Sequence, residues 1–228
     1  MIADNLKRVK DNIANAAAKS GRTAEDILLV AVTKSVPAEV LRRHLDIFLA
    51  ENVTNFGENR VQEMLEKQPL LGADIAWHMI GNLQRNKVKF VLVNAVLIHS
   101  VDSLRLVEEI SRQAAIRGIC ADILLEINIG GESSKHGAAP SAAADFAAQV
   151  MALPNLSVQG LMAIAPFVDN PEQNRGHFKR MAALRDEISA KSCMHMPILS
   201  MGMTGDYAVA IEEGATIVRV GTGIFGGG

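Results

Sequence analysis

The sequence predicts an α/β protein, a single (β/α)8 barrel of the TIM type with an extra helix at its N-terminus. Eight short apolar runs alternate with stretches of helical periodicity along the chain of 228 residues. The run 122–129 is largely apolar, with Ile123, Leu124, Leu125, Ile127 and Ile129, as in parallel strands whose outer face is covered by helices. Eight such units in about 200 residues are typical of a closed barrel.

The elements follow one another in a regular order. The first is a helix over residues 2–19, in which Ile2, Leu6, Val9 and Ile13 recur at helical spacing before Ser20-Gly21. Strands are predicted at 27–33, 53–56, 75–80, 95–99, 122–129, 156–163, 197–200 and 216–220. Helices are predicted at 37–50, 58–68, 84–92, 103–117, 140–152, 171–191 and 205–214.

A doubly wound open sheet would use the same alternation of strands and helices. Its usual signal is a GxGxxG turn after the first strand, whereas this chain has Thr33-Lys34-Ser35 there. The sequence contains no linker, low-complexity tract or convincing repeat. One domain spanning residues 1–228 is therefore the simplest prediction.

Composition excludes several classes of function. The net charge of −2 and the scattered Lys and Arg residues give no basic surface for nucleic acid. Cys120 and Cys193 lack the spacing of a zinc site and are expected to be buried free thiols in a reducing compartment. No apolar run approaches the length of a membrane span, and residues 1–7 carry no secretion signal. We expect a soluble, cytoplasmic protein that binds no metal, nucleic acid or membrane.

Lys34 is the first candidate functional residue, because it ends the apolar run 27–33 and places a primary amine where a buried strand meets its loop. An amine withdrawn from water beside such a strand is more readily neutral and can attack an aldehyde or ketone. The alternative is a lysine that merely ends a strand in solvent.

The carboxyl ends of barrel strands meet on one face, so residues that follow different strands become neighbours. Loops after the seventh and eighth strands are the usual phosphate position of this fold, and Ser200 with Gly221-Thr222-Gly223 suits it. The alternative is that these glycines only turn the chain. An amine and a phosphate cradle together predict a ligand with a carbonyl and a phosphate, such as pyridoxal phosphate or a phosphorylated sugar.

Arg219 precedes the predicted phosphate turn by two residues. Its guanidinium could donate to a pyridine nitrogen at the barrel mouth, or it could pair with a carboxylate inside the barrel. His78 could act as an acid or base, although a histidine in a strand more often has a structural hydrogen-bonding role. Met194, Met196, Met201 and Met203 are interpreted as core residues, with Met201 near enough to line a cofactor ring.

Several motifs, in order along the chain, resemble the pyridoxal phosphate homeostasis (YggS/PROSC) family. The motifs are Val30-Ala31-Val32-Thr33-Lys34, Asn55-Phe56-Gly57-Glu58-Asn59, Trp77-His78-Met79-Ile80-Gly81-Asn82, Ser134-Lys135-His136-Gly137, Gly160-Leu161-Met162-Ala163-Ile164, Leu199-Ser200-Met201-Gly202-Met203-Thr204 and Val218-Arg219-Val220-Gly221-Thr222. The resemblance spans almost the whole chain. It implies one barrel similar to the barrel domain of alanine racemase.

The same resemblance implies roles for individual residues. Lys34 would hold pyridoxal 5′-phosphate as a Schiff base, and Arg219 would face the pyridine nitrogen. The phosphate would be bound by Ser200, Gly221 and Thr222, and the pocket would be lined by Asn55, His78 and Met201. Where family members usually have Ser followed by Asp, this chain has Thr204-Gly205-Asp206, which keeps a hydroxyl and an acid.

The family is described as cofactor carriers that limit free aldehyde and supply apoenzymes, with no dedicated reaction. The resemblance thus implies a non-catalytic protein whose partners are pyridoxal phosphate and recipient apoenzymes. We also expect a monomer. A racemase needs a second base, and the chain has a single tyrosine, Tyr207, and no second domain. An amino-acid racemase and a Schiff-base sugar-phosphate aldolase remain the alternatives.

Overall fold

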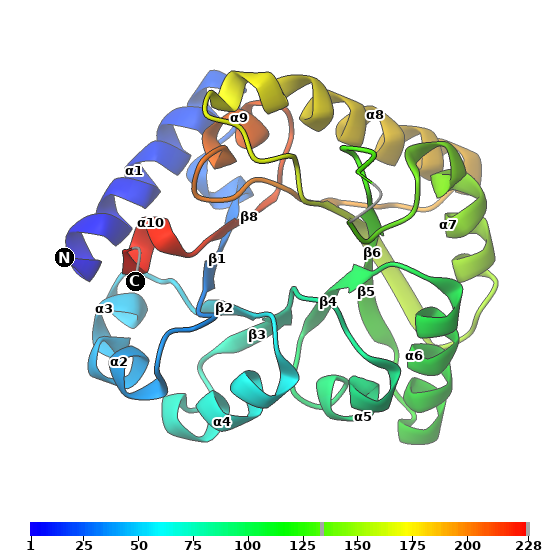
Figure 1. Cartoon of the computed structure of the whole chain (residues 1–228), viewed down its shortest axis with the longest axis horizontal. Helices are drawn as coiled ribbons and strands as arrows, with labels where there is room; N and C mark the ends of the chain where they lie inside the picture. The colour runs from blue at the N-terminus through cyan, green and yellow to red at the C-terminus, as the bar shows by residue number, and fades with distance from the viewer. Residues whose placement is uncertain (133–134, 227–228) are drawn as a thin grey trace.

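The computed structural model describes residues 1–132 and 135–226. In these residues eight parallel strands form a closed barrel, which Figure 1 shows along its axis. Each strand pairs with the next, and β8 pairs with β1 through Leu28↔Ile217 to Ala31↔Val220. The strands are β1 (Leu28–Val32), β2 (Asn55–Glu58), β3 (Ala76–Met79), β4 (Leu97–Val101), β5 (Ala121–Ile127), β6 (Leu156–Ala163), β7 (Ile198–Ser200) and β8 (Ile217–Val220). The predicted barrel is confirmed.

Helices surround the barrel, as Figure 1 shows. The predicted leading helix is α1, which packs beside α9 and α10. The helices are α1 (Ile2–Lys19), α2 (Ala38–Arg43), α3 (Leu45–Ala50), α4 (Val61–Leu71), α5 (Val88–Val91), α6 (Leu104–Arg117), α7 (Ala143–Met151), α8 (Arg175–Ser192), α9 (Tyr207–Glu212) and α10 (Thr222–Phe225). Short 3-10 turns precede β1, α5, α7 and α8.

Some boundaries differ from the predicted ones. The strands expected at 53–56 and 95–99 are β2 and β4, which both start two residues later. Val53 is buried, but pairing with β3 begins only at Asn55↔Ala76. The helix expected at 37–50 is divided at His44, whose ring Nδ1 lies 2.8 Å from the Val40 carbonyl. Apolar periodicity reports burial, and burial extends beyond the hydrogen-bonded segment.

The core has two parts. A large cluster fills the space between the strands and the helices, and a small one fills the barrel interior. The buried members of the inner cluster are Val30, Leu97, Leu124, Met162 and Ile217. Towards the carboxyl ends of the strands the inward-facing residues become polar, with His78, His99, Ser200 and Arg219 all buried. The barrel thus has an apolar lower layer and a polar upper one.

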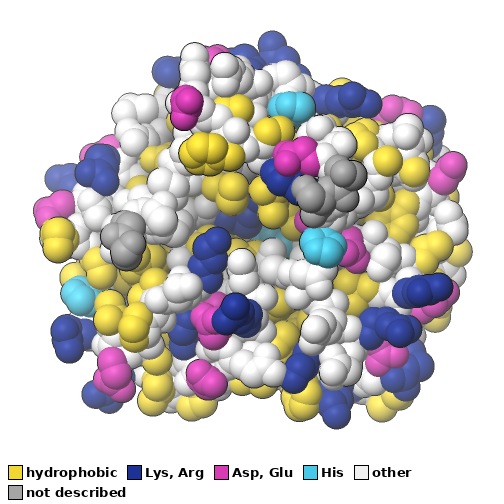
Figure 2. Space-filling model, in the orientation of Figure 1, with side chains coloured by type: hydrophobic (Ala, Val, Ile, Leu, Met, Phe, Trp, Pro, Cys, Tyr) yellow, Lys and Arg dark blue, Asp and Glu magenta, His cyan; other side chains and the backbone are white. Residues whose placement is uncertain are grey.

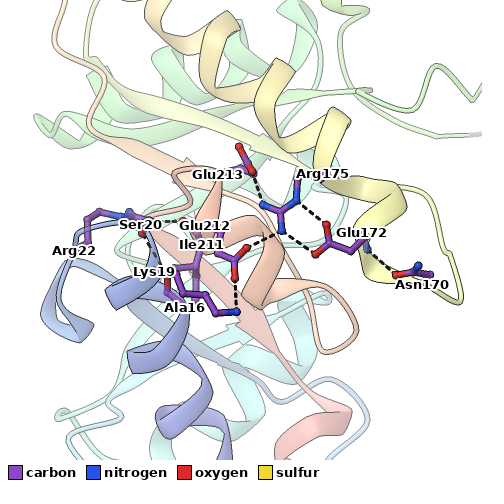
Figure 3. A network of polar contacts seen from close by, with 10 residues as sticks. All are labelled: Ala16, Lys19, Ser20, Arg22, Asn170, Glu172, Arg175, Ile211, Glu212 and Glu213. Carbon is purple, nitrogen blue, oxygen red and sulfur yellow. Dashed lines mark hydrogen bonds and ion pairs between the residues drawn. The ribbon is translucent and has the colours of Figure 1, made fainter.

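A charged network fastens α8 to its neighbours (Figure 3). The Arg175 guanidinium contacts Glu172 at 2.7 Å, Glu212 at 2.7 Å and Glu213 at 2.5 Å. Glu212 also contacts Lys19 of α1 at 2.9 Å. The network joins the start of α8 to α9 and α1 on the outside of the barrel, away from its interior.

Two predictions about side chains are wrong. Cys120 and Cys193 are exposed, not buried, because each lies where the chain leaves a helix: Cys120 precedes β5 and Cys193 ends α8 in a left-handed conformation with φ 53°. Met196 and Met201 belong to the core as expected, but Met194 and Met203 are exposed. Among the described residues, no helix is both long and apolar enough to cross a membrane.

Candidate functional site

The candidate site lies at the carboxyl ends of the strands. Figure 2 shows this face, where basic, acidic and histidine side chains gather around a central hollow. Lys34 follows β1 in a turn and is exposed. The premise that Lys34 is withdrawn from water is therefore wrong for the protein alone, because Thr33 is the last buried residue of this segment. The amine is accessible to a ligand in solution.

A series of five hydrogen-bonded side chains crosses the upper layer of the barrel, which we call the histidine chain. Arg219 donates to Ser200 Oγ at 2.6 Å, and Ser200 Oγ lies 2.9 Å from His99 Nδ1. His99 Nε2 lies 2.9 Å from His78 Nδ1, and His78 Nε2 lies 2.9 Å from Asn55 Oδ1. The histidine chain connects β8, β7, β4, β3 and β2.

The direction of these hydrogen bonds follows from the charges. Desolvation lowers the pKa of His78 to about 4. The pKa of His99 lies well below its ordinary value, because the ring is desolvated and because His78 and Arg219 are nearby. Both rings are therefore neutral at pH 7, with one N–H each. Because Asn55 Oδ1 only accepts, His78 donates to it from Nε2 and accepts at Nδ1 from His99 Nε2. His99 Nδ1 therefore accepts from the Ser200 hydroxyl, which in turn accepts from Arg219.

Arg219 is buried, and desolvation lowers its pKa to about 10, while Glu126 and Asp206 act in the opposite direction. It donates to the carbonyl of Ala163 at 2.9 Å as well as to Ser200. Within residues 1–132 and 135–226 it forms no ion pair, so the predicted alternative of a direct carboxylate partner is wrong. Ser200 is engaged by Arg219 and His99, which leaves its hydroxyl little capacity for a phosphate.

The two loops predicted to hold a phosphate lie together beside β1. The N–H of Gly223 donates to Thr204 Oγ1 at 3.2 Å, and that of Met203 to Asp206 Oδ1 at 2.7 Å. Gly221 precedes α10 and lies so near β1 that an added Cβ would be 3.3 Å from the Val32 carbonyl. Thr222 is exposed. The pairing of β8 with β1 therefore brings this turn and Lys34 to the same part of the barrel.

Met201 does not reach the barrel interior. It is fully buried in the outer cluster, between strands and helices. Ser200 faces inward, so the next residue faces the other side of the sheet. Sequence reasoning placed Met201 near a cofactor ring because it counted distance along the chain and not the face of the strand.

A second polar group lies at the ends of β4 and β5. Glu126 is buried to 7 % exposure, and its pKa is raised to about 7 by desolvation and by Asp102. Asp102 Oδ2 lies 3.3 Å from His136 Nδ1. Glu126 and His136 border a cavity of about 250 Å3, which is lined by Glu126, Ile127, Asn128, Lys135, His136 and Ile164. Ser134, which was part of the predicted loop motif, lies outside the described residues.

His99 and Glu126 were missed by sequence reasoning. Each has a signal in the sequence: His99 is two residues after inward-facing Leu97, and Glu126 is two residues after inward-facing Leu124. In a strand, residues two apart share a face, so a polar residue at an inward position is a candidate for the barrel mouth.

Comparisons with known proteins agree with this architecture. The family model for the alanine racemase N-terminal domain matches residues 5–228. The chain is 43 % identical over 224 residues to the pyridoxal phosphate homeostasis protein of Aquifex aeolicus, which covers 98 % of this chain and 96 % of the relative. A crystal structure of an unknown protein from Bifidobacterium adolescentis matches with a TM-score of 0.89, 40 % identity and coverage of 98 % and 94 % of the two chains. PipY of Synechococcus elongatus, solved with PLP bound, matches with a TM-score of 0.84, 31 % identity and coverage of 99 % and 100 %.

Proposed function

Since the chain belongs to the pyridoxal phosphate homeostasis protein family, we propose that it binds pyridoxal 5′-phosphate through Lys34 and serves as an intracellular carrier and buffer of this cofactor. The observation that carries the proposal is an accessible primary amine after β1, beside the small-residue turn that follows β8. A reversible Schiff base stores an aldehyde without consuming it, because water reverses the reaction.

The residues at this face fit the cofactor. The bound group would supply an aldehyde, a pyridine nitrogen and a phosphate dianion. Lys34 would form the C=N bond, and the aldehyde oxygen would leave as water. The exposed Thr222 and the backbone at Gly221 suit a phosphate, and Thr204 is bound to the next residue of the turn, Gly223. Ser200 would support this turn indirectly, through Arg219.

Arg219 suits the pyridine nitrogen because a guanidinium has five N–H groups, of which two are used by Ser200 and Ala163. The histidine chain fixes its position, with His78 and Asn55 at the far end. A guanidinium cation that donates to this nitrogen disfavours protonation of the nitrogen. An unprotonated ring is a weak electron sink, so the site is suited to holding the cofactor and not to carbanion chemistry.

The environment of Tyr207 favours a carrier over a racemase. Tyr207 is buried on the outside of the barrel, and its hydroxyl accepts a hydrogen bond from Asn12 of α1 at 3.1 Å. The only tyrosine of the chain is thus occupied away from the mouth and does not serve as a second base. The proposal includes no catalytic reaction, one barrel domain over residues 1–228, a monomer and a cytoplasmic location, with apoenzymes as recipients.

The test is transfer of the cofactor. Protein loaded with pyridoxal phosphate is mixed with a cofactor-free aminotransferase, and recovery of aminotransferase activity is compared with that given by the same total amount of free cofactor. A carrier restores activity and lowers the free aldehyde at equilibrium. Racemisation of an amino acid by the loaded protein, or trapping of a sugar-phosphate imine by borohydride, would instead support one of the enzymatic alternatives.

A further inference from the structure

The turn that carries Lys34, residues 33–35, has a conformation that requires support. Ser35 has φ 61°, in the left-handed region that residues with a Cβ rarely adopt. The turn is closed by the N–H of Val36, which donates to the Thr33 carbonyl at 3.0 Å. A residue in this conformation persists where surrounding groups hold it.

Two residues outside the turn hold its first peptide. Lys67 of α4 donates from Nζ to the Thr33 carbonyl at 2.8 Å and to Glu58 Oε1. The Thr33 hydroxyl donates to the same Glu58 oxygen at 2.6 Å. Thr33, the residue immediately before Lys34, is therefore held through both its backbone carbonyl and its side-chain hydroxyl.

A third residue holds the other side of the turn. Glu63 lies one helical turn before Lys67 on α4, so both side chains project from one face of the helix. Glu63 Oε2 accepts a hydrogen bond from the N–H of Ser35 at 3.3 Å and lies 3.6 Å from Lys67 Nζ. The peptides on both sides of Lys34 are thus held by one charged cluster, which consists of Glu58, Glu63 and Lys67.

Burial of this cluster is costly for the fold. Glu58 is fully buried and Lys67 is 4 % exposed. Among the described residues, Glu58 Oε2 has no hydrogen-bond partner. A buried ion pair often adds no more stability than apolar side chains of similar volume, and a buried polar atom without a partner is unfavourable. A requirement for a defined turn geometry explains a charged cluster here better than stability does.

We propose that Glu58, Glu63 and Lys67 are positioning residues that fix the turn 33–35 and thereby the approach of Lys34 Nζ to an aldehyde. The inference rests on the proposed function, because it concerns the amine that forms the C=N bond and releases the aldehyde oxygen as water. A turn ordered in advance does not have to be ordered when the bond forms, so the equilibrium favours the bound form. None of the three residues touches the reacting atoms in this role.

The main variant replaces both buried charges at once. Lys67→Met alone would leave Glu58 charged and unpaired in the interior and could unfold the protein. The double variant Glu58→Gln with Lys67→Met removes both charges at similar volume. Glu63→Ala removes the hydrogen bond to Ser35 from a partly exposed position, and Glu63→Gln keeps an oxygen that can accept it. Glu66→Ala is the matched control, because Glu66 is an exposed acid of the same helix.

The first readout uses protein without cofactor. Amide hydrogen exchange of Ser35 and Val36, measured by NMR, should become faster by about tenfold in the double variant, the change expected when one backbone residue loses its order. Glu63→Ala should accelerate exchange of Ser35, and Glu63→Gln should restore protection. Glu66→Ala should match the wild type. Thermal unfolding of each variant, followed by circular dichroism, shows whether the barrel is intact.

The second readout is the concentration of pyridoxal phosphate that half-saturates the imine absorption band. It should rise by about tenfold in the double variant and in Glu63→Ala, with recovery in Glu63→Gln. Wild-type exchange rates and wild-type half-saturation in folded double and Glu63→Ala variants would overturn the inference. A wild-type protein that forms no imine on Lys34 would refute the proposed function instead, and the exchange comparison would still test the role of the cluster in the turn.

Discussion

Acid should weaken the fold through the histidine chain. His78 is buried, and its pKa is lowered from 6.5 to about 4. The unfolded chain therefore binds a proton at a pH where the folded protein does not. The contribution of His78 to stability is fully present above pH 6.5 and is lost as the pH falls towards 4.

The magnitude follows from the two pKa values. Each pKa unit corresponds to about 1.4 kcal/mol, and linkage gives a loss of about 2 kcal/mol by about pH 5 and about 3 kcal/mol by about pH 4. His99 contributes in the same direction, because its pKa is also lowered. A polar chain that orders the barrel mouth at neutral pH is thus expected to make the protein sensitive to acid.

The assay is urea unfolding at a series of pH values for the wild type and for His78→Gln. Glutamine is a neutral side chain that can accept from His99 and donate to Asn55, so it can replace both hydrogen bonds of His78. The free energy of unfolding of His78→Gln should fall less steeply than that of the wild type below about pH 6.5. At about pH 5 the variant should have lost about 2 kcal/mol less than the wild type. Identical pH dependence of the two proteins would refute the reasoning, because His78 would then titrate alike in the folded and unfolded states.

Three further changes test other parts of the structure. The pKa of Glu126 is raised from 4.5 to about 7, so stability is lost as the pH rises from 4.5 through 7. In urea unfolding, the free energy of unfolding of Glu126→Gln should exceed that of the wild type by about 3 kcal/mol at about pH 9 and by little at about pH 4. Gly160→Ala should cost at least about 3 kcal/mol in the same assay, because its Cβ would lie 1.8 Å from the Ile198 carbonyl in the β6–β7 pairing, whereas Gly176→Ala in α8 has free space and should not destabilise. Lys34→Ala should keep the circular dichroism spectrum and stability within about 0.5 kcal/mol, since Lys34 is exposed, but should bind no cofactor covalently; unfolding of this variant would contradict the separation of fold and site.

Apolar periodicity was sufficient to predict the architecture. Eight apolar runs became eight strands, and Lys34 was predicted at the end of the first because the run stops there. Start positions of β2 and β4 were less accurate, since Val53 is buried without being paired. Local sequence thus reports burial well and the hydrogen-bonding register poorly.

The histidine chain and the cluster behind Lys34 could not be read from local patterns. His99 contacts His78 and Ser200 only because the closed barrel brings distant strands together. Lys67 reads as an ordinary helical lysine, yet the helix buries it against Thr33 and Glu58. Both depend on which face of an element a residue occupies and on what packs against it. The exposed state of Lys34 also follows from the turn and not from the apolar strand before it.

The central claim is that Lys34 holds the cofactor. The most direct test is to incubate the purified protein with pyridoxal phosphate, record the visible absorption spectrum, reduce with borohydride and map the modified peptide by mass spectrometry. We predict a yellow imine band that reduction converts into a phosphopyridoxyl group on Lys34. A protein that stays colourless, or a label on another lysine with Lys34 unmodified, would contradict the account.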